Sequence, residues 1–366
     1  MEDFFKSTEN EVGIFRPLFF RLIDETTILS LKALLTDNPH ISVINEIEGQ
    51  VRELVKSRFP AGLESHHMDN RVADVFGNQS KDTYGVWVYY PWTNKLVHIL
   101  DESEFVELRT NRNQNKITKE EQLLLSKKKI GIIGLSVGQS IALTLTMERG
   151  CGELRIADFD ILELSNFNRI RTPLFNLGVP KVIATAREIS EIDPFVHVKI
   201  FEEGITSANM SDFMLGDGKL DILVDECDSL DIKIKVREFA KEHQIPVIMD
   251  TSDRGMLDVE RFDLEPKRPI FHGRVEGINS EKLKGLSNAE KIPFVLKILG
   301  FDDLSTRAKS SLAEVNKTIS TWPQLATSVI LGGAVGADVS RRILLNEFHD
   351  SGRYYVDIEG IIKNKI

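Results

Sequence analysis

The feature that most constrains the fold of this chain is a regular alternation of short apolar runs and amphipathic segments that begins at Lys129. The apolar runs have the length of buried strands, and the segments between them repeat apolar residues at helical spacing. This alternation predicts a Rossmann-like α/β fold, a mostly parallel sheet with helices on both faces and with ligands at the carboxyl ends of the strands. The expected strands span 129–133, 153–157, 195–200, 220–224 and 245–249, and the expected helices span 137–148, 181–192 and 233–242.

The part of the chain before this alternation predicts a separate, smaller α+β module. Residues 44–59 repeat apolar side chains at helical spacing, and residues 84–100 have the pattern of a β-hairpin. Helical patterns return after Arg274 and end with a small-residue stretch at 331–336 that continues into Arg341, and a last strand is expected at 354–358. The expected domains are an N-terminal module of unknown role at 1–104 and an α/β domain at 105–366.

Composition excludes several classes of protein. The formal net charge of −10 argues against a nucleic-acid binder, which would normally present a basic face. No apolar stretch reaches the roughly 18 residues of a membrane span, and residues 1–5 lack the basic start of a signal peptide, so we expect a cytoplasmic protein. Cys151 and Cys227 are the only cysteines, so neither a disulfide framework nor a four-thiolate zinc site is expected.

A glycine-bearing turn, Gly134-Leu-Ser-Val-Gly138, stands between the first expected strand and helix of the alternation. Backbone N–H groups in such a turn can approach phosphate or ribose oxygens. Ser136 and Gln139 occupy positions where a strict dinucleotide fingerprint has glycine, so the turn alone is a weak signal. The same residues match the nucleophile elbow of α/β-hydrolases, with Ser136 as nucleophile. That alternative needs a late histidine, for which the candidates are His272 and His349.

Charged residues follow the next strands at the edge where a nucleotide would lie. Asp158 comes about twenty residues after the glycine turn, where an acidic side chain accepts hydrogen bonds from a ribose, although an exposed loop aspartate is an equal reading. Arg169 and Lys181 supply positive charge that suits a triphosphate better than a nicotinamide dinucleotide. Asp228, in the acidic run 225–228 after the fourth strand, is a candidate magnesium ligand or a helix cap.

Taken together and in this order, these motifs resemble the ThiF/MoeB/ubiquitin-activating superfamily of adenylyltransferases. The resemblance covers about residues 105–366, and its most specific part is the aspartate run followed by Leu-Ser-Asn-x-x-Arg. The whole chain also looks like a bacterial subgroup in which a flavin nitroreductase-like domain often follows. The matching motifs are Arg109-Thr-Asn-Arg112, Gly134-Leu-Ser-Val-Gly138, Ala157-Asp-Phe-Asp160, Leu164-Ser-Asn-Phe-Asn-Arg169, Gly178-Val-Pro-Lys181, Glu191-Ile-Asp-Pro194 and Asp225-Glu-Cys-Asp228.

The resemblance implies an enzyme that uses ATP and magnesium to adenylate a carboxylate, which could belong to a ubiquitin-like protein, a peptide or a small acid. It implies that Asp158 holds the ribose and that Asp228 acts through magnesium. It also implies a homodimer in which Arg112 reaches into the neighbouring protomer's site, and a possible nitroreductase-like partner. The expected nucleotide contacts are Gly134, Ser136, Gly138, Asp158, Asn166, Arg169 and Lys181, and the expected catalytic residues are Arg112, Arg169, Lys181 and Asp228.

The chain also departs from the family pattern. The Cys-x-x-Cys pairs that bind zinc in many members are missing, so no zinc is expected, and no cysteine stands at the usual thioester position. Cys227 is interpreted as a packing residue beside Asp228. Because the glycine turn is degenerate, a nucleotide-binding scaffold with weakened activity is the first alternative, followed by an NAD-dependent oxidoreductase and the serine hydrolase.

Overall fold

A computed structural model describes residues 13–283 and 286–364 of the chain. Residues 1–5, on which the expectation about a signal peptide rests, lie outside the described residues, as does the start of the expected module 1–104. The chain forms two compact units, of which unit 1 comprises residues 1–119 with 193–195 and unit 2 comprises 120–192 with 196–366. Compact units are not the same thing as folding domains, so the boundary expected at 104/105 remains a prediction.

Unit 1 is a small α+β structure built on a four-stranded sheet with the strand order β1-β3-β4-β2. The predicted hairpin is confirmed, because β3 and β4 pair antiparallel around a turn at Pro91–Thr93. The predicted helix is confirmed as α2, but it starts at Ile47 because Ile44 belongs to the edge strand β2. The elements are β1 (Leu18–Phe20), α1 (Glu25–Asp37), β2 (Ser42–Asn45), α2 (Ile47–Arg58), α3 (Ser65–Phe76), β3 (Val86–Tyr90), β4 (Lys95–Ile99) and α4 (Glu102–Arg109).

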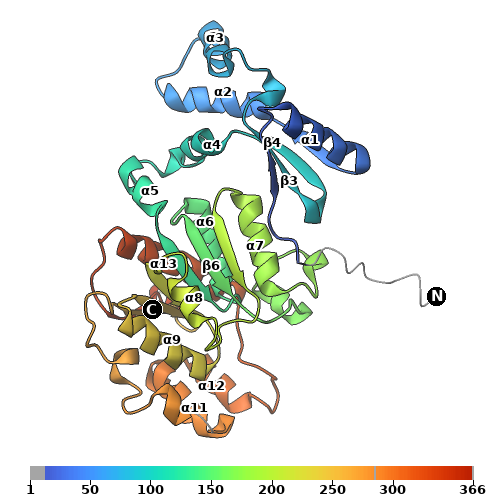
Figure 1. The fold of residues 1–366 in the computed structure, drawn as a ribbon. Helices are drawn as coiled ribbons and strands as arrows, with labels where there is room; N and C mark the ends of the chain where they lie inside the picture. The colour runs from blue at the N-terminus through green and yellow to red at the C-terminus, as the bar shows by residue number, and fades with distance from the viewer. Residues whose placement is uncertain (1–12, 284–285, 365–366) are drawn as a thin grey trace, which may run out of the picture. The chain divides into compact units, whose positions relative to one another are not determined.

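Unit 2 contains the predicted Rossmann-like sheet, which has seven strands in the order β11-β10-β9-β8-β5-β6-β7 (Figure 1). Strands β9, β8, β5, β6 and β7 are parallel, and β10 and β11 are added antiparallel at one edge. The chain order reverses between β5 and β8, which is where doubly wound sheets bind ligands. The strands are β5 (Lys129–Ile133), β6 (Glu153–Ala157), β7 (His197–Phe201), β8 (Ile222–Asp225), β9 (Val247–Thr251), β10 (Met256–Glu260) and β11 (Gly352–Tyr355).

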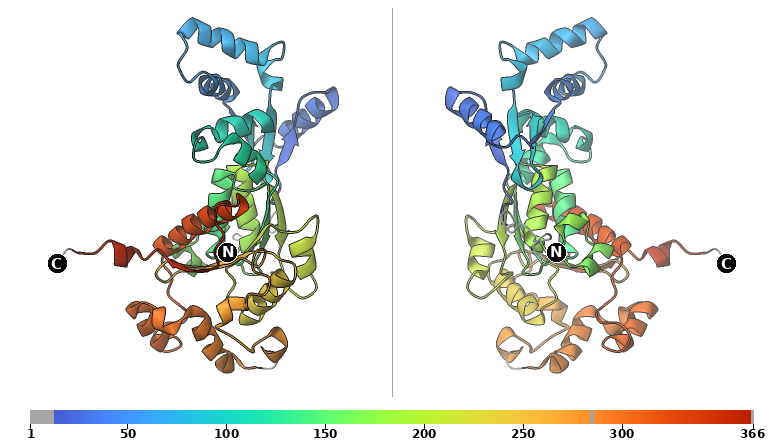
Figure 2. Two further views of the ribbon diagram at one scale, coloured as in Figure 1. Left: turned by 90° about the vertical axis from the view of Figure 1, so that its left-hand side faces the viewer. Right: turned by 90° about the vertical axis from the view of Figure 1, so that its right-hand side faces the viewer.

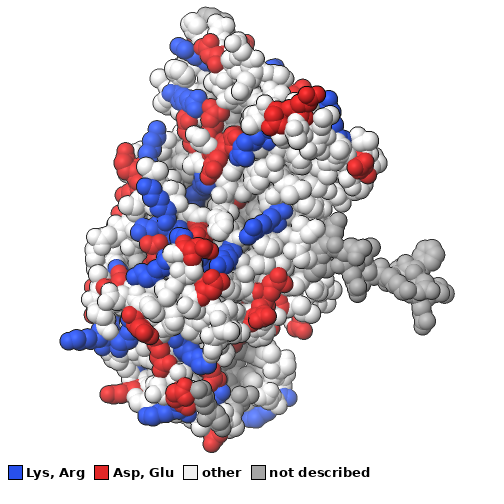
Figure 3. All heavy atoms as spheres, in the orientation of Figure 1, with Lys and Arg blue, Asp and Glu red and all other residues white. Residues whose placement is uncertain are grey.

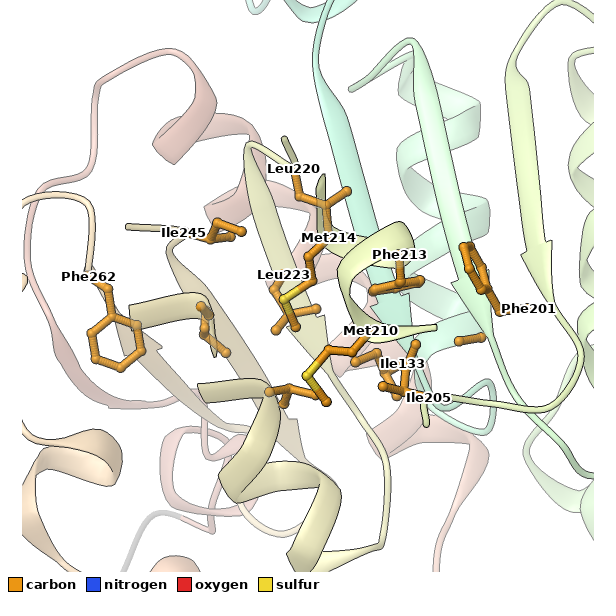
Figure 4. Close-up of a cluster of buried hydrophobic side chains, with 14 residues drawn as sticks. Ile133, Phe201, Ile205, Met210, Phe213, Met214, Leu220, Leu223, Ile245 and Phe262 are labelled. Atoms are coloured by element: carbon orange, nitrogen blue, oxygen red, sulfur yellow. The ribbon is translucent and has the colours of Figure 1, made fainter. Parts of the chain in front are cut away.

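Helices cover both faces of this sheet. On one face α6 packs between α7 and α13, and α13 also contacts β9 and β10. On the other face α8 and α9 bury a core with the sheet that includes Phe213, Leu223 and Val236 (Figure 4). The smaller helices α11 and α12 lie apart from α13 (Figure 2). The helices are α5 (Lys119–Leu125), α6 (Gly138–Glu148), α7 (Lys181–Ile192), α8 (Met210–Leu215), α9 (Leu230–Glu242), α10 (Ser280–Leu283), α11 (Asn288–Leu299), α12 (Thr306–Glu314), α13 (Ala326–Leu344) and α14 (Ile358–Ile361).

In the part of the chain that the structure describes, the helices are too short or too polar to cross a membrane.

A buried ion network ties the central strand β8 to the helix that follows it and to β10. Arg237 on α9 has a fully buried guanidinium that donates to Asp225 at the end of β8 and, at 2.6 Å, to Glu260 on β10. Lys233 adds a second cation 3.2 Å from the Asp225 carboxylate. Burial alone raises the pKa of Asp225, but Lys233 and Arg237 outweigh it and lower the pKa to about 2. Burial raises the pKa of Glu260, and Arg237 acts in the opposite direction. One guanidinium therefore compensates two buried carboxylates, with Lys233 as a second cation for Asp225.

We predict that Arg237→Leu destabilises unit 2 by about 3–5 kcal/mol, because it removes the one cation that pairs with both the Asp225 and the Glu260 carboxylate. Denaturant unfolding followed by circular dichroism measures this loss. The matched control is Arg171→Leu, since Arg171 is 68% exposed where it pairs with Glu188, and its loss should cost at most about 1 kcal/mol. Equal losses in the two variants would contradict the account of the network.

Candidate functional site

The glycine turn lies at the end of β5, against the loop that follows β8. Gly134 has a φ of +85°, and a Cβ atom at this position would stand 2.6 Å from the carbonyl oxygen of Glu226. Only glycine tolerates both the left-handed backbone and this close approach. Gly138 begins α6, and a Cβ atom there would stand 2.6 Å from Ile132. The turn thus places the amino end of α6 at the switch point between β5 and β8.

Asp158 fixes the shape of this turn. Its Oδ2 accepts a hydrogen bond of 2.6 Å from the N–H of Leu135, and its Oδ1 accepts one of 2.8 Å from the N–H of Asp160. Burial raises the pKa of Asp158, while these two N–H groups and the charge of Lys181 act in the opposite direction. The aspartate expected to contact a ribose therefore also joins the loop after β6 to the glycine turn.

Arg169 reaches back to Ser136 of the turn, and Asp228 is near enough for its charge to act on Arg169, although the three residues are far apart in the sequence. The Nε of Arg169 donates to the Oγ of Ser136 at 2.9 Å. Burial lowers the pKa of the half-buried Arg169 guanidinium, and the charge of Asp228 acts in the opposite direction. Asp228 itself is exposed at the carboxyl end of β8. An exposed carboxylate and a guanidinium thus face the same edge of the sheet.

Lys181 forms a second cationic position at this edge. Its side chain is buried, and its Nζ lies 2.7 Å from Oδ2 of Asp160, which is about half exposed. The backbone N–H of Lys181 donates to the carbonyl of Asp160 at 2.9 Å, which fixes the start of α7. The ammonium group is therefore held in place by a carboxylate that solvent or a ligand can reach.

For two of the expected site residues, Asn166 and Arg112, the structure shows no contact with the glycine turn among the hydrogen bonds and ion pairs described. Asn166 is buried, and its side-chain oxygen accepts from the N–H of Glu163 at 3.1 Å, where it forms a capping box for the turn Leu164–Asn168. Its expected contact with phosphates stays a prediction. Arg112 is exposed on the turn Asn111–Asn113 of unit 1, so its expected role at a partner's site also stays a prediction.

The acidic run after β8 divides into structural and exposed members. Asp225 is buried and forms an ion pair with Arg237, so it is a structural anion and is not available as a cation ligand. The Sγ of Cys227 donates to Asp225 at 3.0 Å, and burial together with Asp225 raises the pKa of this thiol well above its usual value. Within residues 13–283 and 286–364, no three His, Cys, Asp or Glu side chains group as a metal site. Asp228 fits magnesium because that ion commonly takes only one or two carboxylates beside phosphate oxygens and water.

The hydrolase alternative lacks its catalytic geometry. Ser136 accepts a hydrogen bond from Arg169, which cannot act as a general base. His272 is held by Asp258 at 3.0 Å and by Arg268, and His349 lies 3.0 Å from Asn346. These contacts do not form a Ser-His-Asp triad.

Glu226, of the acidic run 225–228, forms a pair at the same edge with the buried Asp250, and the sequence did not predict this pair. Oε1 of Glu226 accepts from the N–H of Asp250 at 2.8 Å, and Oδ2 of Asp250 is buried without a hydrogen-bond partner among the described residues. Gly332 of α13 leaves room for this carboxylate, because a Cβ atom would stand 2.3 Å from Oδ2. Burial raises the pKa of Asp250 to about 8, and burial and the Asp250 charge raise that of Glu226. The sequence signal that could have pointed to this pair is the position of Asp250 directly after the apolar run 245–249.

We predict that the free energy of unfolding falls as the pH rises from about 4 to about 8 because of this pair. A carboxyl group whose pKa is raised in the folded state contributes stability below its unfolded pKa and loses that contribution as the pH passes the folded pKa, about 8 for Asp250. Asp250→Asn should flatten this slope and be more stable than the parent at pH 8. Urea unfolding at several pH values tests this, and an unchanged slope would contradict it. Glu203→Gln, at an exposed position, is the control.

Comparison with known proteins gives several relatives of this chain. The chain is 45% identical over 276 residues to an uncharacterized protein of Mycobacterium tuberculosis, covering 75% of this chain and 38% of that protein. It is 31% identical over 199 residues to tRNA threonylcarbamoyladenosine dehydratase 2 of Saccharomyces cerevisiae, covering 54% and 44%. It is 24% identical over 176 residues to the molybdopterin-synthase adenylyltransferase of Haemophilus influenzae, covering 47% and 71%.

The chain thus spans about two fifths of the length of the first two of these relatives. The model of the ThiF family matches residues 109–328, which include the glycine turn, Asp158, Arg169, Lys181 and Asp228. This match covers more than half of the chain and contains the whole edge described above. The chain belongs to the ThiF family.

Proposed function

We propose that this chain uses ATP to adenylate a carboxylate, with an acyl-adenylate and pyrophosphate as products. The observation that carries the proposal is the arrangement at the switch point of the sheet. There the turn fixed by Asp158 contains Ser136, whose hydroxyl accepts from Arg169, and the charge of Asp228 acts on the Arg169 guanidinium. The name of the Haemophilus influenzae relative, an adenylyltransferase, supports the same reaction class.

The proposed chemistry needs positioning and charge neutralisation more than proton transfer. A carboxylate is already ionised at neutral pH, so its oxygen attacks the α-phosphorus of ATP without a general base. The bond from this phosphorus to the bridging oxygen of the β-phosphate breaks, and pyrophosphate leaves with the electron pair. Arg169 and Lys181 would neutralise the phosphate oxygens, and Asp158 would bind the ribose.

Asp228 is the residue that would hold magnesium, which when bound supplies a positive charge to the phosphate oxygens. Lys181 would exchange its contact with Asp160 for one with a phosphate oxygen. The Asp160 carboxylate is about half exposed, so water can solvate it once Lys181 has moved to the phosphate. Asn166 would act through the turn that it caps, or through its amide group. The NAD-dependent alternative is less well supported, because two cations near the turn suit a triphosphate.

The carboxylate, its acceptor and any partner belong to this proposal. We propose a ubiquitin-like C-terminus, a peptide C-terminus or a small acid as the substrate class. A nitroreductase-like protein is the proposed partner in later chemistry. Basic and acidic side chains alternate on the face drawn in Figure 3 and do not gather by sign, which does not favour nucleic acid as a partner.

We further propose a homodimer. Unit 2 carries several large apolar side chains in the segment 159–177 that are each more than half exposed, and monomers rarely expose such a concentration. These side chains are Phe159, Ile161, Leu164, Leu174, Phe175 and Leu177. A two-fold dimer would place both copies of Arg112 equivalently, so each copy could add positive charge to the phosphates at the partner's site.

The first test of the proposed function concerns Asp228. With wild-type protein and a panel of carboxylates, ATP–pyrophosphate exchange should appear, and Asp228→Asn should reduce it at least about 100-fold because the site loses its magnesium ligand. Circular dichroism should show an intact fold, since Asp228 is exposed. Glu203→Gln, another exposed acid of unit 2, should keep the parental exchange rate. Full exchange in Asp228→Asn would remove this residue from the chemistry.

The second test of the proposed function concerns Arg112. Homodimers of Arg112→Ala and of Asp228→Asn should each be inactive. Mixing and refolding equal amounts produces half heterodimers by chance, each with one intact site, so about a quarter of the parental activity should return. If the mixture stays inactive while mass spectrometry confirms heterodimers, both residues act in the same protomer's site. An active monomer would refute the homodimer proposal.

A further inference from the structure

Asn168, which has no part in the proposed chemistry, links the nucleotide edge to the segment 320–325 that precedes α13. Its Oδ1 accepts a hydrogen bond of 3.0 Å from Nη1 of Arg169, and its Nδ2 donates one of 2.8 Å to the main-chain oxygen of Gln324. An arginine can only donate and a carbonyl can only accept, so one orientation of the amide satisfies both contacts. Because the amide is planar, holding its oxygen at Arg169 also directs its nitrogen toward Gln324.

The guanidinium of Arg169 is held on one side and open on the other. Its Nε donates to Oγ of Ser136 at 2.9 Å, and Nη1 lies 3.3 Å from the main-chain oxygen of Ser165 in addition to its bond with Asn168. Nη2 has no hydrogen-bond partner among the described residues. A phosphate oxygen that accepted from Nη2 would fix the guanidinium, and with it the bond from Nη1 to Asn168.

Gln324 reaches across the end of the central strand β8. Its Nε2 lies 3.5 Å from Oγ of Ser252, the first residue after β9. In the sheet, β8 lies between β9 and β5, the strand whose turn contains Ser136. A residue that contacts both the loop held at this turn and the turn after β9 therefore bridges the carboxyl end of β8, where Asp228 follows.

The position of the segment 320–325 depends strongly on Asn168. The segment forms neither helix nor strand, and within the described part of the chain Asn168 is the one side chain that donates to its main-chain oxygens. Trp322 is half-buried, whereas Leu325 is 67% exposed. The segment contains no charged side chain, so a carboxylate can lie against it without repulsion.

We propose that Asn168 is a positioning residue that couples occupation of the phosphate site at Arg169 to the placement of the segment 320–325 over the end of β8. This role rests on the proposed function, in which the carboxylate is bound beside Asp228 and therefore against this segment. ATP would fix Arg169, Asn168 and the segment in turn. The carboxylate would then bind to a segment that is already ordered, at a smaller cost in conformational entropy.

Trp322 makes the placement of the segment measurable without turnover. It is the only tryptophan in the sequence of unit 2, because Trp87 and Trp92 belong to unit 1. Acrylamide quenching of the parent, compared with that of Trp322→Phe, isolates its contribution. Saturating ATP should lower the quenching constant of Trp322 at least about twofold in the parent. Adenosine, which has no phosphate to fix Arg169, should leave it unchanged.

Asn168→Ala should abolish this effect of ATP on Trp322. Its affinity for ATP, measured by calorimetry, should stay within about tenfold of the parent, because Arg169 keeps its bond to Ser136. Asn168 is exposed, so circular dichroism should show an intact fold. The matched control is Ser165→Ala, at an exposed position in the same turn, which should keep the parental effect. A parental effect of ATP in Asn168→Ala, or no effect of ATP in the parent, would overturn the proposal.

ATP–pyrophosphate exchange separates this role from the proposed function. With a carboxylate that supports exchange, Asn168→Ala should raise the KM for that carboxylate at least about fivefold and change kcat less than about threefold. A lower kcat with an unchanged KM would contradict a positioning role. If no carboxylate supports exchange in the parent, the adenylation proposal fails, whereas the effect of ATP on Trp322 and its loss in Asn168→Ala would still support the coupling.

Discussion

The hydrogen bonds accepted by Asp158 are the constraint on which the candidate site depends. One carboxylate oxygen receives the N–H of Leu135, and the other receives the N–H of Asp160. The glycine turn after β5, the loop after β6 and, through the Asp160–Lys181 contact, the start of α7 are thereby fixed relative to one another. A turn that has Ser136 in place of a second glycine keeps a defined shape because this aspartate holds it.

Buried ion pairs and acids lie beneath the exposed edge of the sheet. Arg237 pairs with the buried carboxylates of Asp225 at the end of β8 and of Glu260 on β10, so the strand that precedes Asp228 is anchored by charge as well as by packing. The pair Glu226 and Asp250 adds two acids whose pKa values are raised, chiefly by burial. The edge thus combines a rigid, internally compensated layer with exposed groups, Asp228 and Asp160, that are available to a ligand.

Much of the fold was predictable because unit 2 obeys simple periodic patterns. The strands β5 and β6 and the helix α7 coincide with the expected ranges. The two strands are short buried apolar runs, and the helix repeats its apolar residues at helical spacing. Strand β10 was not foreseen, because Asp258 and Glu260 are buried by ion pairs that no local pattern reveals. For the same reason the sequence did not distinguish the buried Asp225 from the exposed Asp228 within the acidic run 225–228. The alternation placed Ser136, Arg169 and Asp228 at one edge of the sheet, but the hydrogen bond between Arg169 and Ser136 was not predictable, since periodicity does not report which side chains meet.

The central claim is that the carboxyl edge at the β5–β8 switch point binds ATP with its phosphates at Arg169 and Lys181. Calorimetric binding of ATP and of adenosine to the parent and to Lys181→Met tests it most directly. The account predicts that the substitution weakens ATP at least about tenfold and changes adenosine affinity by less than about threefold, because only ATP carries the phosphates. Equal losses for the two ligands, or displacement of ATP by an equal concentration of NAD, would contradict it.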